Sequence, residues 1–136
     1  MKTAFDTDSI LYKLLKRSAV KTAISGGIYV GGGRPLDSNT EDIEINTISV
    51  TQVYCPQIGT SNINIYVPDR NVTIGGREQL QADRKRLCEL ANMVIKVVRS
   101  ANVDGLKVIP TSMTILQEPK VRQHFVNIRV DWNIQN

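Results

Sequence analysis

The sequence has very few of the residues that usually supply metal ligands or nucleophiles. Its 136 residues include one histidine and two cysteines. Cys55 and Cys88 form no CxxC pair and cannot build a disulfide framework. His124 has no second histidine, and no cysteine at ligand spacing, with which to hold zinc. We therefore expect no enzyme activity, no metal and no cofactor.

Long hydrophobic runs are also missing. No apolar stretch approaches the ~20 residues that a membrane-spanning helix needs, and residues 1–6 lack the apolar centre of a secretory signal. Only seven residues are aromatic, so isoleucine, valine and leucine must fill the core. Hydrophobic residues make up 41% of the chain and charged residues 22%, which is typical of one globular domain over residues 1–136.

Glycine is concentrated in clusters, of which Gly31–Gly33 is the longest. Glycine-rich loops can bind phosphate, but a Walker loop ends in GK[ST] and opens a helix. Here Arg34 and Pro35 follow, and the next regular segment has the alternation of a strand. The cluster therefore predicts flexible turns rather than a nucleotide site.

Two segments have helical periodicity. The first covers Thr7–Ala19, with an alternative end at Ala23, and its apolar residues lie opposite its basic ones. The second ends near Ser100 and begins either after Asp83, a good capping residue, or near Arg77. Cys88 falls within this second helix, where we expect it to be buried as a small hydrophobic residue.

Alternation of apolar and polar residues predicts five strands, with a bulge near Thr47. A strand with one apolar face is typical of an antiparallel sheet that has one buried side. The segment order therefore predicts an α+β fold. We expect an antiparallel sheet, with mixed pairing possible, of about four to five strands and with two helices packed on one face. The strands are expected at residues 28–30, 42–51, 62–68, 106–117 and 126–134.

Charge is divided unevenly along the chain, although the formal net charge is only +4. Leu36–Asp69 contains five acidic residues and no basic one, whereas the rest of the chain is basic. Such segregation favours contact between unlike surfaces, but solvated acidic loops and basic helix faces would give the same pattern. The candidate interface consists of Asp37, Glu41, Asp42 and Glu44 facing Arg84, Lys85 and Arg86 of a neighbouring copy.

Several segments together resemble the tail-terminator (tail-completion, or head–tail joining) proteins of tailed phages. The likeness is carried by an opening helix, a Gly-x-Ile-Tyr strand and a following proline, then by two alternating strands, a helix and a closing strand. The corresponding segments are residues 8–15, Gly26–Tyr29, Arg34-Pro35, Glu41–Thr47 and Asn62–Asp69.

This resemblance implies a virion assembly protein rather than an enzyme. It implies a homo-oligomeric ring, commonly a hexamer, that caps the tail tube and joins it to the head–tail connector protein, with DNA as passing cargo. The expected location is the head-proximal end of a phage or prophage tail, after assembly in the host cytoplasm, with no membrane partner.

The alternative is a small nucleic-acid-binding protein that uses the Arg84-Lys85-Arg86 helix face. For the ring, we expect that reversing Asp37, Glu41, Asp42 and Glu44 to lysine weakens assembly. The fold is expected to survive, because these four positions lie outside the alternating core pattern.

Overall fold

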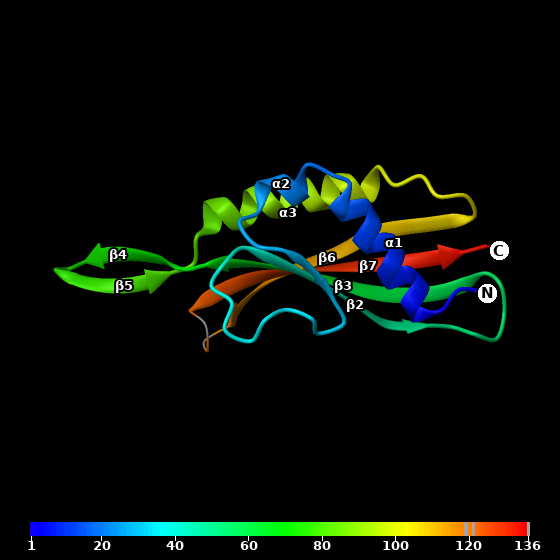
Figure 1. Ribbon diagram of the computed structural model, residues 1–136, viewed down its shortest axis with the longest axis horizontal. Helices are drawn as coiled ribbons and strands as arrows, with labels where there is room; N and C mark the ends of the chain where they lie inside the picture. The colour runs from blue at the N-terminus through cyan, green and yellow to red at the C-terminus, as the bar shows by residue number, and fades with distance from the viewer. Residues whose placement is uncertain (119, 121, 136) are drawn as a thin grey trace.

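A computed structural model describes residues 1–118, 120 and 122–135, and its architecture is α+β, as predicted (Figure 1). The helices are α1 (Ala4–Lys16), α2 (Val20–Ala23) and α3 (Arg84–Arg99). The strands are β1 (Ile28–Val30), β2 (Asp42–Val50), β3 (Gln57–Pro68), β4 (Arg70–Ile74), β5 (Arg77–Gln81), β6 (Leu106–Glu118) and β7 (Gln123–Ile134).

Five of the strands form one mixed sheet in the order β1-β2-β3-β7-β6. The short edge strand β1 is parallel to β2, and all other neighbours in this sheet are antiparallel. The longest uninterrupted register joins β3 to β7, from Gln57 opposite Ile134 to Pro68 opposite Gln123. The predicted bulge is confirmed by a register shift between Thr47 and Ser49.

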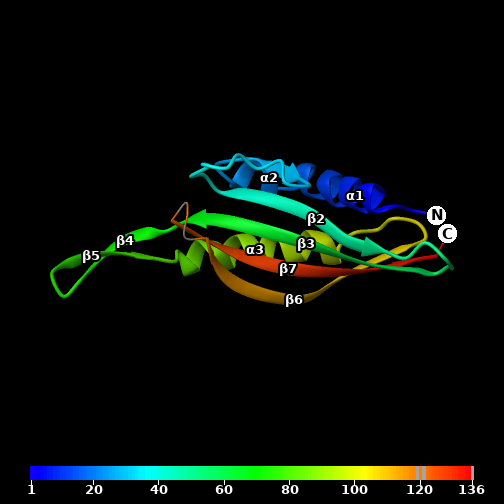
Figure 2. The same ribbon diagram turned by 90° about the horizontal axis from the view of Figure 1, so that it is seen from below.

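The helices all lie on one face of the sheet, and the core lies between them and the strands (Figures 1 and 2). Alternate residues of β3 and β7 point into this core, as the period of two predicts. Trp132 is buried there, and its indole N–H donates to Ser61 Oγ at 2.9 Å. The core strand and helix residues include Leu11, Leu15, Ile43, Ile45, Ile63, Ile65, Leu87, Leu90, Val94, Ile128, Val130 and Ile134.

Helix α1 begins three residues before the predicted start. Thr3 is its N-cap, because Thr3 Oγ1 accepts from the Asp6 N–H at 3.4 Å and Asp6 Oδ2 accepts from the Thr3 N–H at 2.7 Å. The helix ends at Lys16, so the predicted continuous helix to Ala19 is wrong. Ser18 explains the break, because its hydroxyl donates to the Leu15 carbonyl at 2.7 Å and offers the backbone an alternative to helical hydrogen bonding.

Helix α3 begins at Arg84, directly after Asp83, and not near Arg77, the alternative start that the sequence left open. Asp83 caps it, with its carboxylate accepting from the Arg86 N–H at 3.2 Å. Cys88 is exposed, so the expectation that it is buried is wrong. It directly follows the buried Leu87, and one residue turns an α-helix by about 100°, which takes Cys88 off the apolar stripe.

The segment between β3 and α3 forms a hairpin that the sequence analysis did not predict. Strands β4 and β5 pair only with each other as a separate two-stranded sheet, which extends away from the body of the molecule (Figures 1 and 2). Gly75 and Gly76 make its turn with φ of 59° and 79°. Two successive positive φ angles define the hairpin turn that a Gly-Gly pair favours. Every residue of β4 and β5 except Val72 is exposed.

Candidate interaction interface

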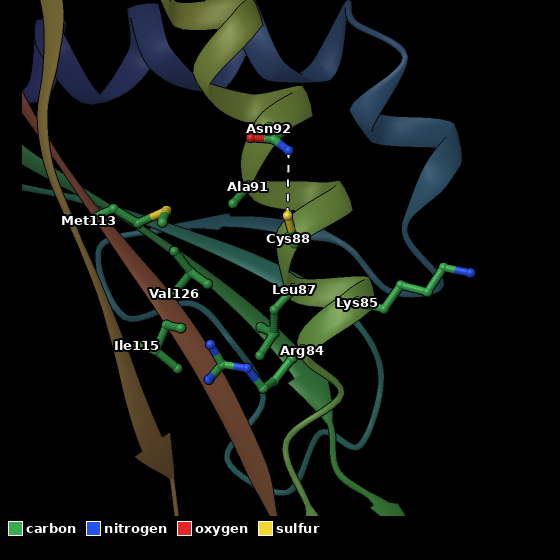
Figure 3. A pocket seen from close by; sticks show the side chains of 9 residues that line it. All are labelled: Arg84, Lys85, Leu87, Cys88, Ala91, Asn92, Met113, Ile115 and Val126. Atoms are coloured by element: carbon green, nitrogen blue, oxygen red, sulfur yellow. Dashed lines mark hydrogen bonds between the residues drawn. The ribbon is translucent and has the colours of Figure 1, made fainter.

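A groove lies between α3 and β6 on the helix-covered side of the molecule (Figure 3). It has a volume of about 350 Å³. Its lining is mostly apolar, with Arg84 and Lys85 at the start of the helix; the apolar and sulfur-bearing lining residues are Leu87, Cys88, Ala91, Met113, Ile115 and Val126. The groove can therefore accept an apolar side chain from another molecule.

The groove exists because β6 extends beyond the cover that α3 provides. Strand β6 is an edge strand, and β7 is its only neighbour in the sheet. Met113 and Ile115 lie opposite the buried Ile128 and Val126 of β7, so they share its core-facing side. They nevertheless remain 53% and 40% exposed. An exposed edge of this kind is a template for contact with another chain.

The three predicted basic residues of α3 point in three different directions. Figure 3 shows the Arg84 side chain extending toward β6 and β7, whereas Lys85 points away from the groove. Arg86 turns inward and binds Glu41, with Nε 2.6 Å from Oε2 and Nη2 3.0 Å from Oε1. The three residues therefore do not present one shared basic face, and this arrangement gives no support to nucleic-acid binding through such a face.

Glu41 and Arg86 form a bidentate ion pair within one copy of the chain. The hydrogen bonds from Arg86 lower the pKa of Glu41 below its usual value, and those to Glu41 raise the pKa of Arg86. The pair ties the end of the loop 31–41 to α3. Glu41 and Arg86 were expected to face unlike charges on a neighbour, but in this structure each already has its partner in the same chain.

Asp42 is buried at the start of β2, so the expectation that it faces a basic residue of a neighbouring copy is wrong. Its exposed fraction is 0%. Oδ1 accepts from the Gly27 N–H at 2.9 Å and the Thr40 hydroxyl at 3.0 Å, while Oδ2 accepts from Arg34 Nε at 2.9 Å and from the Ser38 hydroxyl. Three of these four donors, Arg34, Ser38 and Thr40, belong to the loop 31–41, so the carboxylate organises that loop.

Glu44 is also buried, with an exposed fraction of 8%. Its position does alternate away from the helix-facing core, as the sequence indicates, but the loop 31–41 covers it from the other side. One oxygen accepts from the Gly32 N–H, and the second has no hydrogen-bond partner among the described residues. Glu44 also lines a second cavity, of about 360 Å³, together with Arg34, Leu36 and Tyr66.

These positions correct the expected result of reversing all four acids to lysine. A lysine at the fully buried Asp42 would bury an unpaired charge beside Arg34, and a lysine at Glu44 would place a second cation at a position that is only 8% exposed. The quadruple variant would therefore lose its fold, and its failure to assemble would carry no information about an interface. Asp37 is the one acid of the four that is exposed and makes no ion pair with any described residue.

Leu36, next to Asp37, is the most exposed large apolar side chain of the described residues, at 97%. Sequence alternation could not single it out, because it lies in an irregular loop. Arg34 and Ser38 flank the pair, and both are bound to the buried Asp42. The loop therefore exposes the Leu36 and Asp37 side chains to solvent, while its hydrogen bonds to Asp42 fix the backbone around them.

His124 and the cysteines add no further site. His124 Nδ1 lies 2.6 Å from Asp69 Oδ1, at the end of β3 where the hairpin begins. Among the described residues, no group of three or more histidine, cysteine or acidic residues is placed to hold a metal ion. In the same part of the chain, no helix is both long and apolar enough to cross a membrane.

Comparison with known proteins gives no family: no family model matches the chain, and no curated protein is significantly similar to it in sequence. The functional argument therefore rests on the residues and surfaces described above.

Proposed function

We propose that this chain is a structural subunit of a phage or prophage virion: a tail terminator whose copies form a ring that caps the tail tube and joins it to the head connector. The observation that carries the proposal is the hairpin 70–81, a regular element that is exposed on nearly every residue. An isolated two-stranded hairpin is only marginally stable in water. A regular hairpin whose strands pair only with each other, among the described residues, therefore points to a partner outside the chain.

A second feature supports assembly. The α3–β6 groove and the exposed strand β6 lie at one edge of the sheet. The loop 31–41 lies at the opposite edge, where it joins β1 to β2. Two unlike surfaces on opposite sides of a subunit make head-to-tail contacts, which close into a ring when the rotation permits. The assignment to the tail-terminator family rests on the sequence resemblance. The order of helices and strands in the fold is compatible with that resemblance.

The test is the mass of the protein in solution, measured by light scattering across protein and salt concentration, alone and with a tail tube protein. We expect a defined closed oligomer of about six copies, alone or on the tube. Negative-stain images should show a ring. A protein that stays monomeric at every concentration and does not bind the tube would overturn the proposal.

A hairpin variant sharpens this test. Replacing residues 70–81 by a short glycine-serine linker should leave the sheet folded, because β4 and β5 belong to a separate two-stranded sheet. Binding to the tube or to the connector should be lost. If the variant still assembles and still binds both partners, the hairpin is not a contact element and the observation that carries the proposal fails.

A further inference from the structure

We propose that the Leu36–Asp37 turn of one copy binds in the α3–β6 groove of the next copy, with Leu36 on the apolar floor and Asp37 against Arg84. This contact rests on the proposed function, because it joins two copies within the ring. The inference specifies which residues of two neighbouring copies contact each other, whereas the proposed function does not.

The turn has the chemistry of a ligand for such a groove. Leu36 is 97% exposed, although removing a leucine side chain from water is favourable. The adjacent Asp37 has no ion-pair partner among the described residues. An exposed leucine beside an unpaired acid fits a site that offers apolar surface and one cation.

The turn is also held ready for binding. Arg34, two residues before Leu36, donates to Asp42 Oδ2 at 2.9 Å, and the hydroxyl of Ser38 donates to the same oxygen. The turn is thus fixed on both sides to a fully buried carboxylate. A segment that is already ordered loses less conformational entropy on binding, and so binds more tightly.

The groove offers the matching chemistry. Its floor is formed by Leu87 and Ala91 of α3 together with Met113 and Ile115 of β6. Figure 3 shows the Arg84 side chain reaching over this floor beside Ile115. Arg84 makes no ion pair with any described residue, so it is available to an acid from another copy.

The two surfaces cannot meet within one copy, and their placement suits a head-to-tail contact. The loop 31–41 joins β1 to β2 at one edge of the sheet, whereas the groove lies along β6 at the other edge (Figure 2). Each subunit therefore has one turn to offer and one groove to fill. In a closed ring every turn and every groove is occupied, which no open dimer achieves.

The first experiment uses the native thiol in the groove. Cys88 is exposed on α3 and lines the groove, so the variant Leu36→Cys in a Cys55→Ser background should form disulfides between copies under mild oxidation. We expect a ladder of covalent species up to the full oligomer on non-reducing gels. Two matched controls should give no ladder: Leu36→Cys with Cys88→Ser, and Phe5→Cys, another exposed apolar position.

The second experiment exchanges the charges. Asp37→Arg alone and Arg84→Glu alone should each raise the concentration needed for assembly, and the chain that carries both changes should assemble again at close to the original concentration. Lys85→Glu is the matched control, because Lys85 points away from the groove and its reversal should change assembly little. Leu36→Ser should raise the assembly midpoint roughly 10-fold or more, since it removes the apolar contact.

The outcomes separate this inference from the proposed function. If the wild type forms its oligomer but the Leu36→Cys variant cross-links no faster than Phe5→Cys, the inference is wrong and the ring stands. The same conclusion follows if Arg84→Glu and Lys85→Glu act alike, or if the double exchange gives no rescue, because the groove would then serve a different partner. A wild type that never assembles, alone or on the tail tube, overturns both.

Discussion

The loop 31–41 and the hairpin 70–81 both lie outside the five-stranded sheet, and they are held in opposite ways. The loop has no regular secondary structure, yet three of its residues donate to Asp42 and Arg86 binds its end through Glu41. The hairpin has a complete set of strand pairs from Arg70–Gln81 to Ile74–Arg77, yet almost all of it is exposed. Regular structure is therefore a poor guide to which segment depends on the rest of the fold.

This difference between the loop and the hairpin indicates which contacts stabilise each segment. The loop is part of the cooperative unit, because unfolding it would expose a buried carboxylate and release an ion pair. The hairpin can open without exposing core residues, so its stability is local. Substitutions in the loop should change the free energy of unfolding of the whole protein, and substitutions in the hairpin should not.

The largest effect is expected for Asp42→Ala. Removing this carboxylate leaves the Arg34 guanidinium, whose side chain is only 11% exposed, without its acidic partner and should cost about 3–5 kcal/mol of unfolding free energy. Urea denaturation followed by circular dichroism measures it. Asp37→Ala is the matched control in the same loop, and its effect should stay within about 0.5 kcal/mol. Equal effects for the two would mean that Asp42 does not anchor the loop.

A smaller effect is expected from one pair of glycine substitutions with similar backbone strain. Gly32 in the loop has φ of 84° and Gly76 in the hairpin has φ of 79°. Alanine in this left-handed conformation costs about 1–2 kcal/mol at either position. We expect Gly32→Ala to lower the global unfolding free energy by that amount. Gly76→Ala should instead speed amide hydrogen exchange in β4 and β5 and leave the urea midpoint unchanged.

Glu41→Gln should lower stability by about 1 kcal/mol at pH 7, because it removes an ion pair whose side chains are 15% and 29% exposed. The pH dependence has a definite sign. Arg86 lowers the pKa of Glu41 below 4.5 in the folded state, so the pair stabilises the protein above that pH and its contribution is lost as the pH falls through the lower, folded-state pKa. Stability curves of the two proteins, measured by urea denaturation, should converge as the pH falls below the ordinary pKa of a glutamate. Parallel curves would contradict this role.

The smallest effect is expected for Ile74→Ser, at the exposed end of β4. The unfolding free energy should change by less than about 0.5 kcal/mol, because no core contact is lost. Binding to the tail tube protein is the sensitive measurement here, since an exposed isoleucine at a hairpin tip is apolar surface for a partner. A large loss of stability would show that the hairpin belongs to the cooperative unit after all.

The fold was largely predictable because its core obeys simple periods. The alternation in residues 62–68 and 126–134 identified the central strands, and it placed the correct residues on the buried face. The hairpin was missed because its strands carry polar residues on both faces. The Gly75-Gly76 pair between two five-residue strands was the signal that could have identified it.

The candidate interface was less predictable, because contacts between segments that are distant in the sequence decide which of its residues are buried. Sequence alternation shows which side of a strand a residue occupies, but not whether a distant loop covers that side. Glu44 faces away from the helices as expected, and the loop 31–41 then buries it. The pairing of Glu41 with Arg86 joins residues 45 positions apart, which no local pattern reveals.

The position of β7 in the sheet has a consequence for how the protein is made. This strand comes from residues 123–134, yet it lies between β3 and β6 and pairs with both. A nascent chain on the ribosome therefore has no neighbour for β6, and no second neighbour for β3, until residue 134 has been synthesised. Chains that terminate early would leave the edges of β3 and β6 unpaired and would be substrates for aggregation and proteolysis.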